Sequence, residues 1–145
     1  VLHMLRFVVG DAAFWRGLHI YGTRHAYGVV TTRDLQAAME EASGKRLDWF
    51  FDEWTAKAGY PEFEVEQKWD RATRVVEVRV RQVQPTSDVV PVFRMPVELK
   101  IATKRGARIE RVTVDAKENV YRFRCASEPT AVTLDPNDWL LKVVD

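Results

Sequence analysis

The sequence contains very little cysteine and no long hydrophobic run. Cys125 is the single cysteine among 145 residues, so no disulfide can form within the chain, and we expect this residue to be a small core side chain. No apolar run reaches the roughly 20 residues that a membrane-spanning helix needs. We therefore expect a globular domain protein without a membrane span. Cytoplasmic and exported locations both stay open.

An excess of charge of either sign is also missing. Lys and Arg number 22 against 21 Asp and Glu, for a net charge of +1. Nucleic-acid partners select strongly basic surfaces, so no nucleic acid is expected. Alternation in the second half could place four arginines on one sheet face: Arg79, Arg81, Arg122 and Arg124. We expect neighbouring carboxylates to neutralise them as cross-strand pairs, rather than leave a binding site: Glu62, Glu64, Glu66 and Glu77.

Residues with the spacing of a catalytic or metal site are absent as well. The three histidines, His3, His19 and His25, show no i, i+4 spacing, no His-Glu-x-x-His motif and no companion cysteines. We expect them to be structural or at the surface, with His25 a satisfied core histidine. The adjacent carboxylates Glu40-Glu41 and Asp52-Glu53 would point about 100° apart on a helix, as on a solvated face. The sequence therefore predicts no catalytic and no metal-binding residues in this chain.

The first 60 residues show the period of helices. Residues 1–9 are largely apolar, and Ala12 to about His25 carries a stripe at helical spacing. A third helix is predicted from Thr31 or Thr32 to Ser43, with Gly44 at its C-terminus, and a fourth from Asp48 to about Lys57. Asp11 and Asp48 are expected to cap the second and fourth helices. The short loops predict antiparallel packing of these helices.

Two glycines lie inside the predicted second helix. Gly17 and Gly22 each weaken a helix by about 1 kcal/mol relative to Ala. They indicate either the close approach of a neighbouring helix or simply a weak helix.

From Tyr60-Pro61 onward the hydrophobic period changes to two. Six or seven strands with one apolar face each predict an antiparallel β-sandwich, so the fold class is α+β. Pro85 to Asp88 is expected to be a loop. Because proline cannot donate to a ladder, Pro91 and Pro96 predict an edge strand or a bulge at the third strand. The predicted domains are residues 1–60, which are helical, and residues 61–145, which form a sandwich.

An aromatic-rich stretch, Leu47 to Trp54, lies just before the boundary. Aromatic side chains all round a short helix indicate burial all round. We expect these residues to pack between layers or domains, and the hypothesis covers five positions: Trp49, Phe50, Phe51, Trp54 and Tyr60.

Several motifs together resemble one enzyme family. In the first half these are Val9-Gly10-Asp11, Phe14-Trp15-Arg16-Gly17-Leu18, Tyr21, His25-Ala26-Tyr27-Gly28, Thr31-Thr32-Arg33-Asp34-Leu35, Ala42-Ser43-Gly44, Leu47 to Trp54 and Gly59-Tyr60-Pro61. In order and spacing they resemble the end of the thermolysin-like catalytic domain of aminopeptidase N-type zinc metallopeptidases (gluzincins). The second half is similar to the small fibronectin III-like sandwich that follows in that family, through Gln82-Val83-Gln84, Pro91-Val92-Phe93, Pro96-Val97 and Leu134-Asp135-Pro136.

The resemblance implies that the zinc ligands, the substrate-amine loop and the transition-state tyrosine precede Val1, so no catalytic or metal residue is carried over. The parent would remove N-terminal amino acids from peptides with a zinc-activated water. We expect this chain to be a non-catalytic fragment, inactive alone and without its own cofactor. Its partner would be the missing N-terminal catalytic portion. In that portion's absence, exposed apolar helices could make the chain self-associate.

Two alternatives stay open at this stage. The chain could be a self-contained helix-plus-sandwich interaction module, or a family member that kept the scaffold and lost the metal. A His-Glu-x-x-His motif encoded within the preceding hundred or so residues separates the fragment from both.

Overall fold

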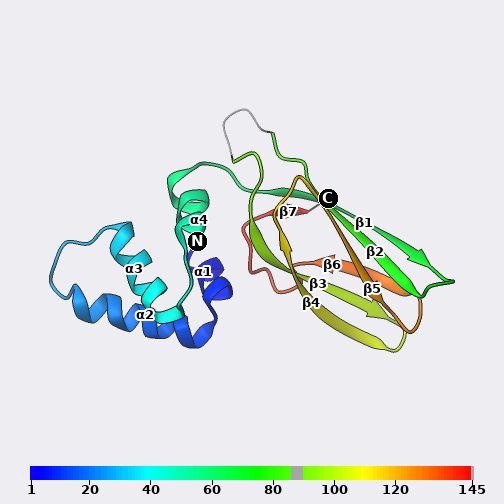
Figure 1. Cartoon of the computed structure of the whole chain (residues 1–145), viewed down its shortest axis with the longest axis horizontal. Helices are drawn as coiled ribbons and strands as arrows, with labels where there is room; N and C mark the ends of the chain where they lie inside the picture. The colour runs from blue at the N-terminus through cyan, green and yellow to red at the C-terminus, as the bar shows by residue number, and fades with distance from the viewer. Residues whose placement is uncertain (86–89, 145) are drawn as a thin grey trace. The chain divides into compact units, whose positions relative to one another are not determined.

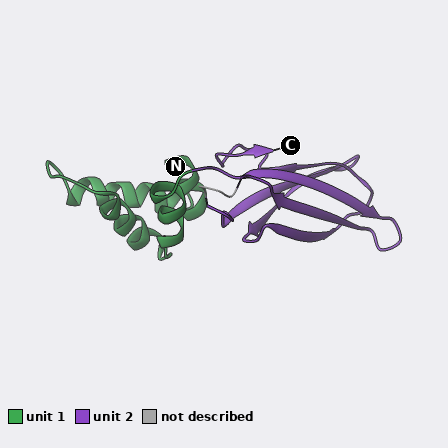
Figure 2. Ribbon diagram, turned by 90° about the horizontal axis from the view of Figure 1, so that it is seen from above, with its two compact units in different colours: residues 1–58 green, residues 59–145 purple. Residues whose placement is uncertain are grey.

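A computed structural model describes residues 1–85 and 90–144. The chain divides into two compact units, residues 1–58 and 59–145 (Figure 2). Helices precede strands along the chain, and the strands form two sheets (Figure 1). The α+β prediction is therefore confirmed. Most of the loop expected at Pro85 to Asp88 falls outside the described residues.

The helical unit contains four helical segments close to the predicted positions. They are α1 (Leu2–Val9), α2 (Asp11–Arg24), α3 (Thr32–Ser43) and α4 (Asp48–Phe51), which continues as the π-helical turn η1 (Asp52–Ala56). The π-helical turn was not predicted, because periodicity alone does not distinguish it from an α-helical continuation.

Helix ends follow the local sequence only in part. Thr31 and Asp34 form a capping box, with Thr31 N–H donating to Asp34 Oδ2 at 2.7 Å, and Gly44 adopts the left-handed conformation with φ 67°. The predicted caps at Asp11 and Asp48 are wrong, because both are the first helical residues. Their carboxylates accept charge-assisted hydrogen bonds from Arg6 and Arg46 instead.

Two long cationic side chains satisfy carbonyls at the C-terminal ends of helices. The Lys45 ammonium donates to Val8 O of α1 at 2.7 Å, and the Arg16 guanidinium donates to Ala42 O of α3. The last carbonyls of a helix have no partner within the helix, so these contacts tie α1 and α3 to neighbouring segments.

The glycines of α2 have different environments. A Cβ on Gly17 would lie 2.6 Å from Met39 Sδ and 3.3 Å from Met39 Cα, whereas a Cβ on Gly22 would meet nothing within 4 Å. Gly17 therefore permits the close approach of α3. Gly22 only weakens α2.

The described residues of the second unit form seven strands. They are β1 (Glu62–Asp70), β2 (Val75–Gln82), β3 (Met95–Thr103), β4 (Gly106–Val114), β5 (Glu118–Arg124), β6 (Pro129–Leu134) and β7 (Val143–Val144). The sheet orders are β5-β2-β1-β7 and β4-β3-β6. All pairings are antiparallel except β1 with β7, which is parallel, so the purely antiparallel expectation is wrong at that edge.

The core of this unit follows the predicted alternation. Six inward-facing residues of β2 and β3 are at most 1% exposed: Val76, Val78, Val80, Val97, Leu99 and Ile101. Cys125 is 6% exposed and free, as predicted for a small core residue.

The edge strand predicted from the prolines is not observed, because β3 lies at the centre of its sheet. Asp135 N–H donates to Glu98 O at 2.6 Å, so even-numbered residues of β3 direct their backbone groups toward β6. β6 ends at Leu134, opposite Leu99, and no β6 residue lies opposite Pro96. The missing N–H of Pro96 therefore breaks no ladder bond. The register irregularity of β3 lies at Ala102/Thr103 instead.

A buried amide network explains two sequence motifs. Gln82, 2% exposed, donates from Nε2 to Phe93 O at 2.8 Å and accepts from Phe93 N–H at 2.8 Å. The buried Gln84 donates to Gln82 Oε1 at 3.1 Å. Gln82-Val83-Gln84 thus holds the backbone at the end of Pro91-Val92-Phe93. Because Phe93 is fully buried, leaving its backbone groups unpaired would cost about 1–3 kcal/mol each.

The β4 and β5 edges are joined by side chains. Tyr121 O–H donates to Thr113 O at 2.5 Å, and the Arg108 guanidinium donates to Arg124 O at 2.6 Å. Burial, together with the nearby Asp115 carboxylate, raises the pKa of Tyr121 to about 12. This side of the sandwich is therefore closed by hydrogen bonds between the two sheets.

Gly17→Ala is expected to destabilise the chain by about 1–3 kcal/mol, because Met39 must move away from the new methyl group. Gly22→Ala is the matched control, with an expected gain of up to about 1 kcal/mol from helix propensity. Urea unfolding measures both. Equal effects of the two substitutions would contradict close packing at Gly17.

Tyr121 is expected to ionise near pH 12 in the folded chain, against about 10 when unfolded. The raised pKa contributes stability that is present below pH 10 and is lost as the pH rises toward 12. Absorbance at 295 nm should show a late phenolate transition that Tyr121→Phe removes. A titration unchanged by Tyr121→Phe would refute this assignment.

Candidate functional site

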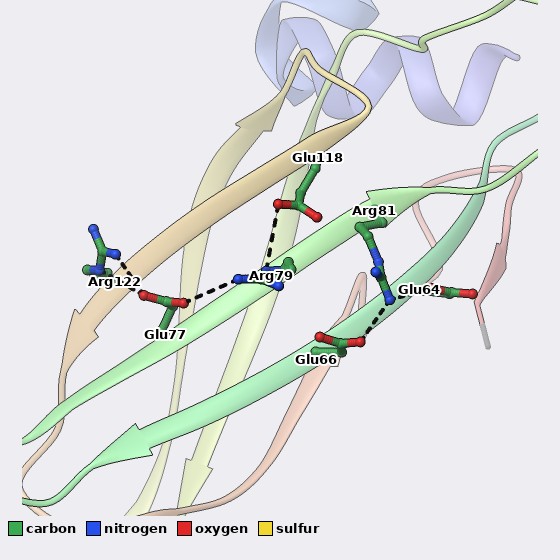
Figure 3. A network of polar contacts seen from close by, with 7 residues as sticks. All are labelled: Glu64, Glu66, Glu77, Arg79, Arg81, Glu118 and Arg122. Atoms are coloured by element: carbon green, nitrogen blue, oxygen red, sulfur yellow. Dashed lines mark hydrogen bonds and ion pairs between the residues drawn. The ribbon is translucent and has the colours of Figure 1, made fainter.

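The first candidate is the arginine-rich face predicted on the β5-β2-β1 sheet. Arg81 contacts Glu64 and Glu66, each at 2.8 Å, and Arg122 contacts Glu77 at 2.8 Å (Figure 3). Arg79 lies 3.8 Å from both Glu77 and Glu118 (Figure 3). The predicted cross-strand neutralisation is confirmed for Arg81 and Arg122, whereas Arg79 pairs with Glu77 of its own strand and with Glu118. These three arginines of the face are therefore neutralised by carboxylates. Exposed pairs of this kind contribute about 0–1 kcal/mol each.

The aromatic stretch forms the second candidate. Phe50, Phe51 and Trp54 are 1%, 5% and 7% exposed, and Trp49 is half-buried. Phe50 contacts both neighbouring rings edge-on, with centroids 5.7 Å from Trp49 and 5.6 Å from Phe51. The π-helical turn follows at once, and Thr55 O–H donates to Phe51 O at 2.6 Å.

Phe51 also borders an apolar groove of the helical unit. The groove has a volume of about 570 Å³. Its apolar lining comes from the N-terminal residue, α1, α2, the loop before α3, α3 and α4: Val1, Leu2, Leu5, Tyr21, Val30, Leu35 and Phe51. Val1, Leu2 and Val30 on its rim are 49%, 50% and 40% exposed. Surfaces of this kind are typical of protein contact sites.

A polar groove of about 720 Å³ shares Thr32, Phe51 and Thr55 with the apolar one. Gln36 bridges Glu40 and Asp48 there, at 3.2 and 3.1 Å, and Glu40 Oε1 accepts from Leu47 N–H at 2.7 Å. Hydrogen bonding from Arg46 lowers the pKa of Asp48. The two grooves together form a continuous surface, apolar at one end and polar at the other, which we call the α-groove.

The structure brings together four of the five predicted packing residues. Trp49, Phe50, Phe51 and Trp54 lie in the helical unit, whereas Tyr60 belongs to the second unit and is 44% exposed. Their role in domain packing stays a prediction. Sequence reasoning missed the polar residues Gln36, Glu40 and Asp48, which come together only when α3 packs beside α4.

The solvated-face prediction for the carboxylate pairs is only partly right. Asp52 is exposed and pairs with Lys57, and Glu41 pairs with Arg24 at 2.9 Å. Glu53, however, is only 9% exposed. Packing of η1 buries this residue. The residue spacing of the segment alone does not predict that burial.

The three histidines are exposed or half-buried, so the expected core position of His25 is wrong. His3 and His19 are exposed, and half-buried His25 lies against the Tyr21 ring with Nε2 3.9 Å from Asp34 Oδ1. Within residues 1–85 and 90–144, no three His, Cys, Asp or Glu side chains gather closely enough to hold a metal ion. These residues do not fit a zinc site. In the same part of the chain, no helix combines the length and apolar character that crossing a bilayer requires.

Comparison with protein-family models matches residues 1–54 to the peptidase family M1 domain. Aminopeptidase N of Lactococcus lactis is 46% identical over 61 residues, which are 42% of this chain and 7% of that protein. Tricorn protease-interacting factor F2 of Thermoplasma volcanium is 32% identical over 122 residues, which are 83% of this chain and 14% of that protein. The chain thus spans a small part of the length of these relatives.

Among solved structures, the chain is similar to Legionella pneumophila aminopeptidase A in complex with aspartic acid. The TM-score is 0.82 at 18% identity, covering 99% of this chain and 17% of that chain. At this identity the match supports the fold. Together the comparisons confirm the resemblance predicted from the sequence motifs.

Trp54→Ala is expected to destabilise the chain by about 3–5 kcal/mol, because the indole is almost fully buried. Trp15→Ala is the matched control, since that indole is 56% exposed and contacts the Arg6 guanidinium, 5.5 Å from the ring centroid, and the edge-on Phe14 ring at 5.3 Å. Its cost should be about 1 kcal/mol or less. Equal losses in chemical unfolding would contradict the packing role of Trp54.

Proposed function

We propose that this chain, which carries part of an aminopeptidase N-type M1 peptidase region, is the non-catalytic helical wall and following sandwich domain of a zinc-dependent aminopeptidase. In this proposal residues 1–60 complete the catalytic domain, and residues 61–145 form a fibronectin III-like domain. The parent enzyme removes N-terminal amino acids from peptides. The match of residues 1–54 to the M1 domain carries the proposal.

The zinc of the parent is assigned to residues outside the described part of this chain. The described residues bring no suitable donor set together. The contribution of this chain is therefore structural: its helices support the catalytic domain, and the aromatic stretch packs at the domain boundary.

The α-groove supports a packing role for the helical unit. Its rim exposes Val1, Leu2 and Val30, and burying apolar surface yields about 25 cal/mol per Å². We propose that the remaining catalytic portion of the same polypeptide covers this surface.

The decisive test is the reading frame upstream of Val1. The proposal expects a His-Glu-x-x-His motif encoded within about the preceding hundred residues. It further expects the full-length product to bind zinc and hydrolyse aminoacyl p-nitroanilides, while the 145-residue chain does neither. A frame without the motif would support a self-contained interaction module. Hydrolysis by the 145-residue chain alone would also overturn the proposal.

The isolated chain is expected to self-associate through the α-groove. Leu2→Glu should shift sedimentation toward the monomer, because it places a charge on the apolar rim. Leu141→Glu changes a similarly exposed leucine in the second unit, at 57% against 50%, and should leave association unchanged. A monodisperse wild-type monomer would count against an uncovered packing surface.

A further inference from the structure

One edge of the β6 strand directs backbone groups away from its sheet. In the β6–β3 pair, the hydrogen bond from Asp135 N–H to Glu98 O shows which backbone groups of β6 point toward β3. By alternation, those of Ala131 and Thr133 face β3. Val132 and Leu134 therefore direct their N–H and C=O groups outward. An outward row of this kind is a template for an additional strand.

The β1 strand offers a second outward edge nearby. Val83 N–H donates to Glu62 O at 2.8 Å, so even-numbered residues of β1 face β2 and odd-numbered residues face outward. Within the described part of the chain, β7 pairs with β1 at Glu62 and Phe63. The backbone groups of Val65 lie beyond that pairing.

These two edges border one groove of about 520 Å³, which we call the seam groove. Its lining includes Val65, Val132, Leu134 and Val144. The opposite side of the sandwich differs, because the outward carbonyls of Thr113 and Arg124 accept hydrogen bonds from Tyr121 and Arg108. One side is thus closed by the chain's own side chains, and the other is open.

The C-terminal part of the β6 edge also lacks the usual protection against strand pairing. Natural edges carry charged residues, proline or bulges that prevent another strand from adding. Pro129 and the register shift at Thr130 stand at the start of β6, and the rest of the strand, residues 131–134, contains neither charge nor proline. The outward positions Val132 and Leu134 lie in this unprotected part.

Charge at the seam groove favours a cationic ligand. Asp135 and Asp138 share one cation, Lys142, at 2.8 and 3.2 Å. These lining residues carry one more carboxylate than cations, so they leave a net negative charge at the groove.

We propose that the seam groove binds an extended, Lys- or Arg-flanked peptide segment that adds to the outward edge of β6 as a further strand. Backbone hydrogen bonds at Val132 and Leu134 provide the pairing, and the negative charge of Asp135 and Asp138 with Lys142 selects the basic flanks. β7 provides a precedent within the chain, since it is a short strand already added to the β1 edge of the same groove. The proposal stands on the sheet edges alone and is independent of the proposed function.

The test uses the full 145-residue chain and a fluorescein-labelled peptide of alternating Thr and Val with two Lys at each end. Its counterpart carries Glu in place of Lys. Anisotropy should give at least tenfold tighter binding for the Lys peptide. Val132→Pro, which removes an outward N–H, should weaken this binding at least tenfold. Ile109→Pro is the control, because it removes an outward N–H from the opposite edge strand, β4, and should leave binding unchanged.

Amide hydrogen exchange of the unmodified chain gives a second measurement that does not depend on the folding of either variant. The Lys peptide should slow exchange at Val132 and Leu134 and leave Ile109 unaffected. Equal binding of the two peptides, equal effects of the two proline variants, or unchanged exchange at Val132 would each overturn the proposal. Dimer formation that Val132→Pro abolishes, without peptide binding, would assign the β6 edge to a second copy and overturn it too.

Discussion

The need to pair every backbone polar group explains most of the structure. Helix ends take their missing partners from long cations, as Lys45 does for α1 and Arg16 for α3. The buried Gln82 side-chain amide forms hydrogen bonds with both backbone groups of Phe93. Pro96 is tolerated in a central strand because its nitrogen faces the β6 side, where β6 has already ended at Leu134. Side chains form hydrogen bonds with outward backbone carbonyls at the β4 and β5 edges. The outward backbone groups of β6 are instead the proposed site for an added strand.

Local patterns in the sequence were sufficient for the elements and their order. Helical spacing in the first half and alternation at Val76, Val78 and Val80 follow from which face is buried, and this burial is observed. The Thr31–Asp34 capping box and Gly44 are likewise local signals that the structure reproduces. Family motifs gave the relationship, which the comparisons confirm over residues 1–54.

Features that depend on distant partners could not be predicted. The π-helical turn at Asp52–Ala56 and the burial of Glu53 arise from packing within the helical unit. The parallel pairing of β7 depends on where the chain returns after Asp135. The hydrogen bond between Gln82 and Phe93 joins residues that are eleven positions apart in the sequence. The α-groove illustrates the same limit. Its apolar residues could be recognised from helical spacing in the sequence. The Gln36–Glu40–Asp48 group could not, because it forms only when α3 and α4 pack together.

The ionic network on the β5-β2-β1 face has a consequence for how this surface can change during evolution. Arg81 forms ion pairs with two carboxylates, and Glu77 forms ion pairs with two guanidinium groups. Replacing one member would leave the charge of its partner unpaired, whereas a compensating exchange across the strands would restore the ion pair. Substitutions at these positions should therefore accumulate as correlated pairs, so that covariation in a family alignment would mark strand register here more clearly than the identity of any single residue.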